Sequence, residues 1–204
     1  MFDRRRHWET IYGDRKPEDV SWFQETPAVS LELIRGAAPS KAARVLDVGG
    51  GASRLADFLS EDGFTALSVL DISGRALAHS RERLGARANN ISWIESDISA
   101  FVPPAPYDVW HDRAVFHFLT EKADRDAYLG VLRRSLKPGG AMILAAFAPD
   151  GPEKCSGLPV RRYDAALVRE TFGPDFKLIL ETAETHITPW NAEQRFSYFL
   201  LKRA

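Results

Sequence analysis

Short β-rich runs alternate with helical stretches over most of this chain, and this alternation restricts its fold more than any other feature. Strands are expected at Arg44–Val48, Phe64–Leu70, Ile91–Ile94, Tyr107–Trp110 and Ala141–Phe147. Apolar residues at helical spacing predict helices at Ser53–Ser60, Ser73–Leu84, Glu121–Leu136 and Asp164–Thr171. Repeats of this kind build a parallel sheet with helices on its faces. Two further expected strands, Lys177–Glu184 and Arg195–Lys202, complete an α/β pattern.

The first 39 residues differ in texture from the rest of the chain. They contain two expected helices, His7–Tyr12 and Ala28–Gly36, and several aromatic residues, among them Trp8, Tyr12 and Trp22. This segment is too short to form a domain of its own. We therefore expect one domain over residues 1–204, in which residues 1–39 pack on, or close over, an α/β core at residues 40–204.

Composition argues against several classes of function. The 27 Lys and Arg residues nearly cancel the 28 Asp and Glu residues, so bulk charge favours neither nucleic acid nor a membrane surface as a partner. Cys155 is the only cysteine, which excludes an intrachain disulfide and favours a reducing compartment. The chain start resembles no secretory signal, and the longest apolar run, Ala141–Ala148, is too short for a membrane span. We expect a cytoplasmic protein in which Cys155 is an exposed thiol of the loop Pro149–Val160.

A glycine-rich turn follows the first strand, where parallel α/β sheets bind ligands. It contains Gly49, Gly50 and Gly51, so the backbone can turn tightly and a ligand can lie directly against it. A dinucleotide fingerprint would need a third spaced glycine, and Arg54 stands there instead. Asp47 precedes the turn, and its charge would repel a pyrophosphate but attract an ammonium group. The turn therefore favours a ligand with an amino-acid end.

Acidic residues also follow the next two strands. Asp71, at the end of the second strand, is placed to accept hydrogen bonds from both hydroxyls of a ribose, with Ile72 as an apolar surface beside it. Asp97, after the third strand, is placed to accept from an exocyclic amine, with Ile98 against the ring. Each acid alone is more often a helix cap or a surface charge. Acids at three successive strand ends together favour a nucleoside linked to an amino acid.

These motifs carry a family resemblance. VLDVGGGASRL, VLDIS, SDI, YDVWHDRAVFHFL and LKPGG, in this order and spacing, resemble the class I S-adenosylmethionine-dependent methyltransferases over roughly Arg44–Phe147. The resemblance implies a Rossmann-like sheet of seven mostly parallel strands in the order 3-2-1-4-5-7-6, with strand 7 antiparallel and helices on both faces. It also implies S-adenosylmethionine as the cofactor and S-adenosylhomocysteine as its product.

The resemblance assigns residues to parts of the cofactor. It carries Asp47, Gly49 and Gly51 to the methionine end, with Gly50 in the same turn, Asp71 to the ribose, and Asp97 with Ile98 to the adenine. Ser53 replaces a further glycine that many members have. This serine, with the aromatic N-terminal segment, is similar to methyltransferase-like enzymes that include protein-lysine methyltransferases, while DVSWFQETPAVSLELI is similar to a bacterial methyltransferase-like branch. By that similarity Trp8 and Tyr12 cover the methionine end; the alternative is that they only pack on the sheet.

The end of the fourth strand is the expected acceptor side. His111 is expected to reach the cofactor, chiefly through its backbone, while Asp112 and Arg113 either orient an acceptor, together with Trp22, or form a local ion pair. His117 is a candidate general base because its ordinary pKa is suited to neutral pH, although a histidine between two phenylalanines is more often packed. No histidine or cysteine spacing typical of a metal site is present, so no metal is expected.

The sequence therefore predicts an enzyme that transfers a methyl group from S-adenosylmethionine to an O, N or S atom of a small molecule. A protein lysine is the alternative acceptor. An alternative of another class is a non-catalytic sensor of S-adenosylmethionine or a nucleotide. The identity of the acceptor and the oligomeric state do not follow from the sequence.

Overall fold

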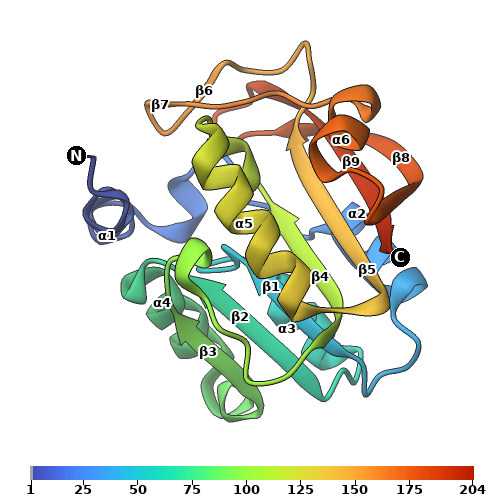
Figure 1. The fold of residues 1–204 in the computed structure, drawn as a ribbon. Helices are drawn as coiled ribbons and strands as arrows, with labels where there is room; N and C mark the ends of the chain where they lie inside the picture. The colour runs from blue at the N-terminus through green and yellow to red at the C-terminus, as the bar shows by residue number, and fades with distance from the viewer. Residues whose placement is uncertain (1) are drawn as a thin grey trace.

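A single large β-sheet organises the molecule (Figure 1). The computed structural model describes residues 2–204, and within them seven strands pair in the order β3-β2-β1-β4-β5-β9-β8. The strands are β1 (Arg44–Val48), β2 (Ala66–Asp71), β3 (Ile91–Glu95), β4 (Tyr107–Arg113), β5 (Leu136–Phe147), β8 (Phe176–Ile187) and β9 (Glu193–Arg203). The strands β1 to β5 pair in parallel, and β9 runs antiparallel to both β5 and β8. Counted within this sheet, β8 is sixth and β9 seventh, so the predicted order 3-2-1-4-5-7-6 is confirmed.

Helices cover both faces of the sheet, as expected. One apolar cluster joins the sheet to α2 (Ala28–Ala37), α3 (Leu55–Glu61) and α4 (Gly74–Leu84). The other joins it to α5 (Lys122–Ser135) and α6 (Ala165–Phe172). Alternation along β1 divides the side chains, because Val45 faces the first cluster while Leu46 and Val48 face the second. A strand covered on both faces in this way is largely apolar, which is why the sequence marked these strands clearly.

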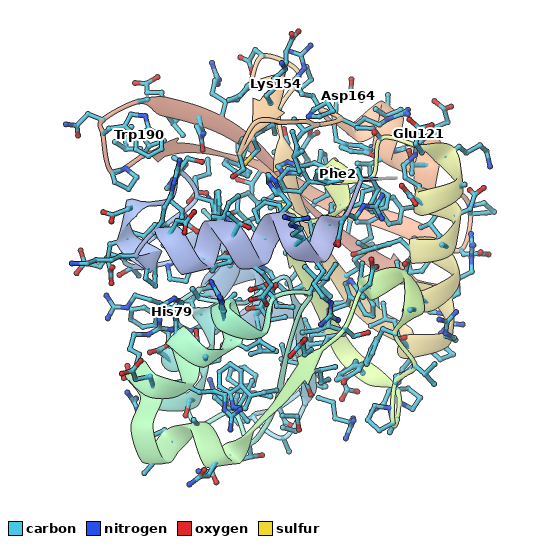
Figure 2. All side chains as sticks on the ribbon, turned by 90° about the vertical axis from the view of Figure 1, so that its left-hand side faces the viewer. Phe2, His79, Glu121, Lys154, Asp164 and Trp190 are labelled. Carbon is cyan, nitrogen blue, oxygen red and sulfur yellow. The ribbon has the colours of Figure 1, made fainter. Side chains whose placement is uncertain are left out.

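Helix α1 (Arg4–Asp14) lies apart from these two layers. It begins at Asp3, whose side chain accepts a hydrogen bond from the Arg6 N–H at 2.9 Å. Figure 2 shows α1 crossing the front of the molecule, above the helix α4 that carries His79. Helix α2 packs on one face of the sheet, and residues of α1 line a cleft at the ends of its strands.

Several elements extend beyond their predicted bounds, among them β4 and β5. The fourth strand does not end at Trp110 but continues to Arg113. The fifth begins at Leu136, which pairs with Tyr107, so the expected turn lies within β5 as an irregularity before regular pairing resumes at Ala141. The longer fourth strand matters for the site, because alternation along it decides the face on which each of its last side chains lies.

The loop that follows β5 also differs from expectation. It contains a small hairpin, β6 (Lys154–Cys155) paired with β7 (Leu158–Pro159), drawn at the top of Figure 1. The prediction that Cys155 is exposed was wrong. Its side chain is 4% exposed, because the hairpin folds it against the apolar cluster that contains Phe147 and Phe196. Among residues 2–204, no helix has the length and apolar character needed to cross a membrane.

Candidate functional site

The glycine turn after β1 has no room for side chains. Gly49 has φ +68°, and a Cβ there would overlap Cγ2 of Val115. Gly51 has φ +22°, and its Cβ would lie 2.8 Å from the Cβ of Ala76. A Cβ on Gly50 would overlap the carboxylate of Asp47. The turn is therefore a backbone surface that glycine alone can form without displacing its neighbours.

Asp71 lies beneath this turn at the end of β2. Its side chain is buried, and its Oδ1 accepts a hydrogen bond from the Ser73 N–H at 2.8 Å. Burial raises the pKa of this carboxyl to about 7, against the lowering effect of the Ser73 hydrogen bond, and the nearby charge of Asp47 raises it further. A carboxyl group at this place is suited to accept hydrogen bonds from a ligand, such as those of ribose hydroxyls.

Asp97 follows β3 and has a structural role in the chain itself. Its Oδ1 accepts from the Ser99 N–H at 2.8 Å and from the Ser99 hydroxyl at 2.7 Å, which caps the short helical turn Ile98–Ala100. This leaves Oδ2 for a ligand. Ile98 is buried beside Asp97 and offers an apolar surface to a base.

The ends of β1, β2, β3 and β4 meet around a cleft of about 800 Å³, counted with the space open to solvent. Seven of the predicted cofactor residues line it: Trp8, Tyr12, Gly49, Asp71, Ile72, Asp97 and Ile98. We call it the nucleoside cleft, because it holds the predicted ribose and adenine residues.

A second cavity, of about 550 Å³, shares the walls at Tyr12, Trp22, Gly49 and Arg113. The remaining predicted cofactor residues that line it are Asp47, Gly50, Ser53 and His111. We call it the amino-acid cavity. Of the residues predicted for the cofactor, Gly51 lies on neither wall; its carbonyl instead accepts a hydrogen bond from the Ser80 hydroxyl at 2.7 Å.

A chain of buried hydrogen bonds holds Asp47 in place. Nδ1 of His111 donates to Oδ1 of Asp47 at 2.7 Å, and Nε2 of His111 lies 2.9 Å from the hydroxyl of Ser30. All three side chains are buried and line the amino-acid cavity. The imidazole ring of His111 is therefore part of the cavity wall, whereas the sequence led us to expect a contribution chiefly from its backbone. Ser30 was missed, because it lies in α2 and nothing near it in the sequence indicates contact with β4.

Helix α1 covers the nucleoside cleft with aromatic side chains. Trp8 packs edge-on against Trp22 and Phe118, with ring centroids 5.7 and 5.1 Å apart. Tyr12 accepts a hydrogen bond from Nε1 of Trp22 at 3.3 Å. Phe118 was not predicted for the site, and it reaches the cleft wall through the short turn that follows β4.

Ion pairs hold α1 to the elements on both sides of the cleft. They join Arg4 to Asp124, Arg5 to Glu95, and Glu9 to Arg75. The first partner lies on α5, the second on β3 and the third on α4. Their side chains are partly exposed, so each pair stabilises the closed position of α1 only weakly, and salt screens it.

The residues expected on the acceptor side do not all lie in one place. Arg113 and Trp22 line both cavities, whereas Asp112 lies on the opposite face of the sheet. Asp112 is fully buried and accepts hydrogen bonds from the Tyr128 hydroxyl at 2.6 Å and the Val115 N–H at 3.0 Å. Burial raises its pKa to about 6. Asp112 is therefore a hydrogen-bonded residue of the core, and it lines neither cavity.

His117 is likewise enclosed. Its ring is fully buried between Phe118 and Phe147, and both nitrogens lack a hydrogen-bond partner within residues 2–204. Burial lowers its pKa to about 3, and the charge of Arg113 lowers it further. His117 lines neither cavity, so no acceptor in them would touch it, and we do not carry the base role forward. Cys155 does line the nucleoside cleft, but burial raises its thiol pKa to about 11, which keeps it protonated and unreactive.

In the part of the chain that the structure describes, no three His, Cys, Asp or Glu side chains come together as metal ligands would. The site is therefore a backbone turn with three acids near strand ends, an aromatic cover and two arginines, Arg4 and Arg113.

Known proteins with similar sequences and structures include several methyltransferases. A family model described as a methyltransferase domain matches residues 46–142. Trans-aconitate 2-methyltransferase of Azoarcus sp. is 30% identical over 76% of this chain and 55% of its own. Demethylmenaquinone methyltransferase of Thermus thermophilus is 30% identical over 71% of this chain and 62% of its own. The chain thus spans about half the length of the curated relatives it matches. A crystal structure described as an SAM-dependent methyltransferase from Anabaena variabilis has a TM-score of 0.79 at 18% identity, covering 100% of this chain and 96% of that one, and shares its fold.

Proposed function

We propose that the chain, whose residues 46–142 match a methyltransferase-domain model, is a class I S-adenosylmethionine-dependent methyltransferase. It binds this cofactor across its two cavities and transfers the methyl group to a small molecule. One observation carries the proposal. Asp47, Asp71 and Asp97 follow or end three neighbouring strands and line two cavities that meet at Gly49. A ligand with an ammonium group, a ribose and a base matches these acids in that order.

The residues fit the cofactor on their own chemistry. In the amino-acid cavity, Asp47 is oriented by His111 and would pair with the ammonium group. The close packing at Gly49 and Gly50 leaves only backbone facing the ligand. In the nucleoside cleft, Asp71 would accept from the ribose hydroxyls, and Asp97 from the exocyclic amine of adenine.

When bound, S-adenosylmethionine supplies a methyl group that its sulfonium already activates. The chain is left with alignment and the exclusion of water. Trp8, Tyr12 and Trp22 serve the second task, because they form an aromatic wall between the cleft and solvent. Within residues 2–204, His111 is the one histidine that lines either cavity, and its two ring nitrogens are engaged by Asp47 and Ser30. We therefore propose an acceptor that needs no histidine base.

We propose an O, N or S atom of a small molecule as the acceptor atom. The two relatives described above are named for small molecules, trans-aconitate and demethylmenaquinone. Neither is named for a protein lysine, so the alternative lysine acceptor has no support and we do not propose it.

A turnover experiment tests the enzymatic proposal and separates it from the sensor alternative. Purified protein with S-adenosylmethionine labelled in its methyl group would be added to the small-molecule fraction of a bacterial extract. We expect label in at least one metabolite, and expect Asp71→Asn to abolish it. Asp62→Asn is the matched control, because Asp62 makes only a surface ion pair with Arg35 and should leave labelling unchanged. Binding of the cofactor without any labelled product would favour the sensor.

A further inference from the structure

Arg113 is the residue lining both cavities whose side chain has a buried nitrogen without a hydrogen-bond partner within residues 2–204. Its side chain is 9% exposed. Nε donates to the Tyr198 hydroxyl at 2.9 Å, Nη1 donates to the Trp22 carbonyl at 3.1 Å, and the guanidinium lies over the ring of Phe196 at 4.3 Å. These contacts fix the plane of the guanidinium before any ligand is present.

The third nitrogen of this group has no hydrogen-bond partner. Nη2 is buried, and no acceptor among residues 2–204 lies within hydrogen-bonding reach. The nearest carboxylate, Oε2 of Glu184, is 3.6 Å away and accepts from the Tyr198 hydroxyl instead. Glu184 therefore balances charge without satisfying the donor. A buried charged donor without an acceptor is costly, and a ligand that supplied one would bind correspondingly more tightly.

Arg113 lies where the two cavities meet. Within residues 2–204, it is the one lysine or arginine that lines the amino-acid cavity, and it also lines the nucleoside cleft. Its neighbours on the cleft wall are mostly apolar, among them Ala114, Phe118 and Cys155. A ligand at this end of the cleft would meet flat apolar walls and one fixed cation.

The partner of Nη2 could be a carboxylate of the cofactor's methionine end or one of the acceptor, and the direction of the guanidinium bears on this choice. Arg113 is on β4, which has β1 with its glycine turn on one side and β5 on the other. Its contacts, Tyr198 and Phe196, belong to β9 beyond β5. The group thus points away from Asp47 and the glycine turn, toward β5 and β9.

We propose that Arg113 binds a carboxylate of the methyl acceptor through Nη2, so that the substrates of this protein are small organic acids. This inference rests on the proposed function of the same site. The carboxylate anchors the acceptor, and the atom that receives the methyl group lies elsewhere in the molecule. A guanidinium already held by three groups is preorganised to bind a carboxylate with little loss of side-chain freedom.

A panel of paired compounds tests the proposal. It would contain hydroxybenzoic and aminobenzoic acids and aliphatic dicarboxylates and tricarboxylates, each with its primary amide. Methyl transfer from labelled S-adenosylmethionine would be measured for the wild type, Arg113→Gln, Arg113→Lys and Tyr198→Phe. Binding of S-adenosylhomocysteine would be measured by calorimetry for the same four proteins, and thermal melting would confirm that each is folded.

We expect acids to be methylated and their amides not. Arg113→Gln should raise KM for the best acid at least about tenfold, as loss of one charged hydrogen bond implies, while the Kd of S-adenosylhomocysteine changes less than about twofold. Arg113→Lys should restore part of the loss because it keeps the charge. Tyr198→Phe should retain the preference for acids, since it leaves Nη2 in place.

Three results would overturn the proposal: amides methylated as well as acids, no methylated acid although the wild type binds S-adenosylhomocysteine, or a loss of S-adenosylhomocysteine affinity in Arg113→Gln as large as the loss for acids. The last result would assign the guanidinium to the methionine carboxylate of the cofactor. Failure of the proposed function itself would look different, because the wild type would then not bind S-adenosylhomocysteine.

Discussion

Gly49→Ala tests the cradle at the glycine turn, because the structure separates two costs of that change. The first is conformational: φ is +68°, and an L-residue in the left-handed region costs about 1–2 kcal/mol. The second is steric: the new Cβ would overlap Cγ2 of Val115, and forced packing of this kind costs about 1–3 kcal/mol. Together they predict a loss of about 2–5 kcal/mol in the free energy of unfolding.

Val115→Ala removes only the steric part. It deletes Cγ2 and leaves the Val115 Cβ, which would be 3.5 Å from the new methyl group, an ordinary contact distance. Because Val115 is only partly buried, the single change should cost about 1 kcal/mol. The double variant should therefore be about 1–3 kcal/mol more stable than the sum of the single changes predicts.

Urea unfolding of the four proteins, with ΔG extrapolated to water, measures this coupling. Equal slopes of ΔG against urea among the four would show that each unfolds from the same compact state. If the two changes were additive, the Val115 methyl would not be what excludes a side chain at Gly49, and the cradle as described would be wrong.

Three further predictions concern the core and the cover. Tyr128→Phe should lower the free energy of unfolding by about 2–5 kcal/mol, because it leaves Nε1 of Trp110 unpaired and removes a donor from Asp112. The Tyr128 hydroxyl stabilises the ionised form of Asp112, whose folded pKa is about 6, so the loss in urea unfolding should be larger at pH 8, where Asp112 is ionised, than at pH 5. In the wild type, the pKa of His117 is lowered to about 3 in the folded state, so acid protonates the unfolded chain first and stability falls between pH 6.5 and 3. His117→Leu should make this fall smaller, and urea unfolding of both proteins across that pH range checks it. Trp8→Ala should weaken S-adenosylhomocysteine binding, measured by calorimetry, at least about tenfold, with a change in melting temperature of only a few degrees, because Trp8 covers the cleft and is only half-buried.

The features that the sequence predicted well are local in the chain. Gly49, Gly50 and Asp47 are joined in one turn, and Asp71 ends the next strand, so strand periodicity and turn chemistry were enough to place them at one edge of a parallel sheet. The strand order itself came from family resemblance. Pairing of distant strands leaves no signal in composition or spacing.

The contacts that were missed join distant segments. Ser30 meets His111 only because α2 packs over β4, a contact between residues 81 positions apart. Cys155 is buried because a two-residue strand pair folds the loop back, and strands that short have no periodicity to detect.

Asp112 and Arg113 show how a small boundary error affects a functional interpretation. With the fourth strand ended at Trp110, both residues seemed equally available to an acceptor. The strand continues to Arg113, and alternation then turns Asp112 toward α5 and Arg113 toward the cavities. Three more residues of strand were enough to exclude one candidate and retain the other.

Calorimetric titration of the wild-type protein with S-adenosylhomocysteine, and separately with NAD⁺, tests the central claim most directly. We expect saturable binding of S-adenosylhomocysteine at one site with a Kd in the micromolar range, and no binding of NAD⁺. The charge of Asp47 would repel a pyrophosphate, and Arg54 replaces the third glycine of a dinucleotide fingerprint. Saturable binding of NAD⁺ without any response to S-adenosylhomocysteine would contradict it.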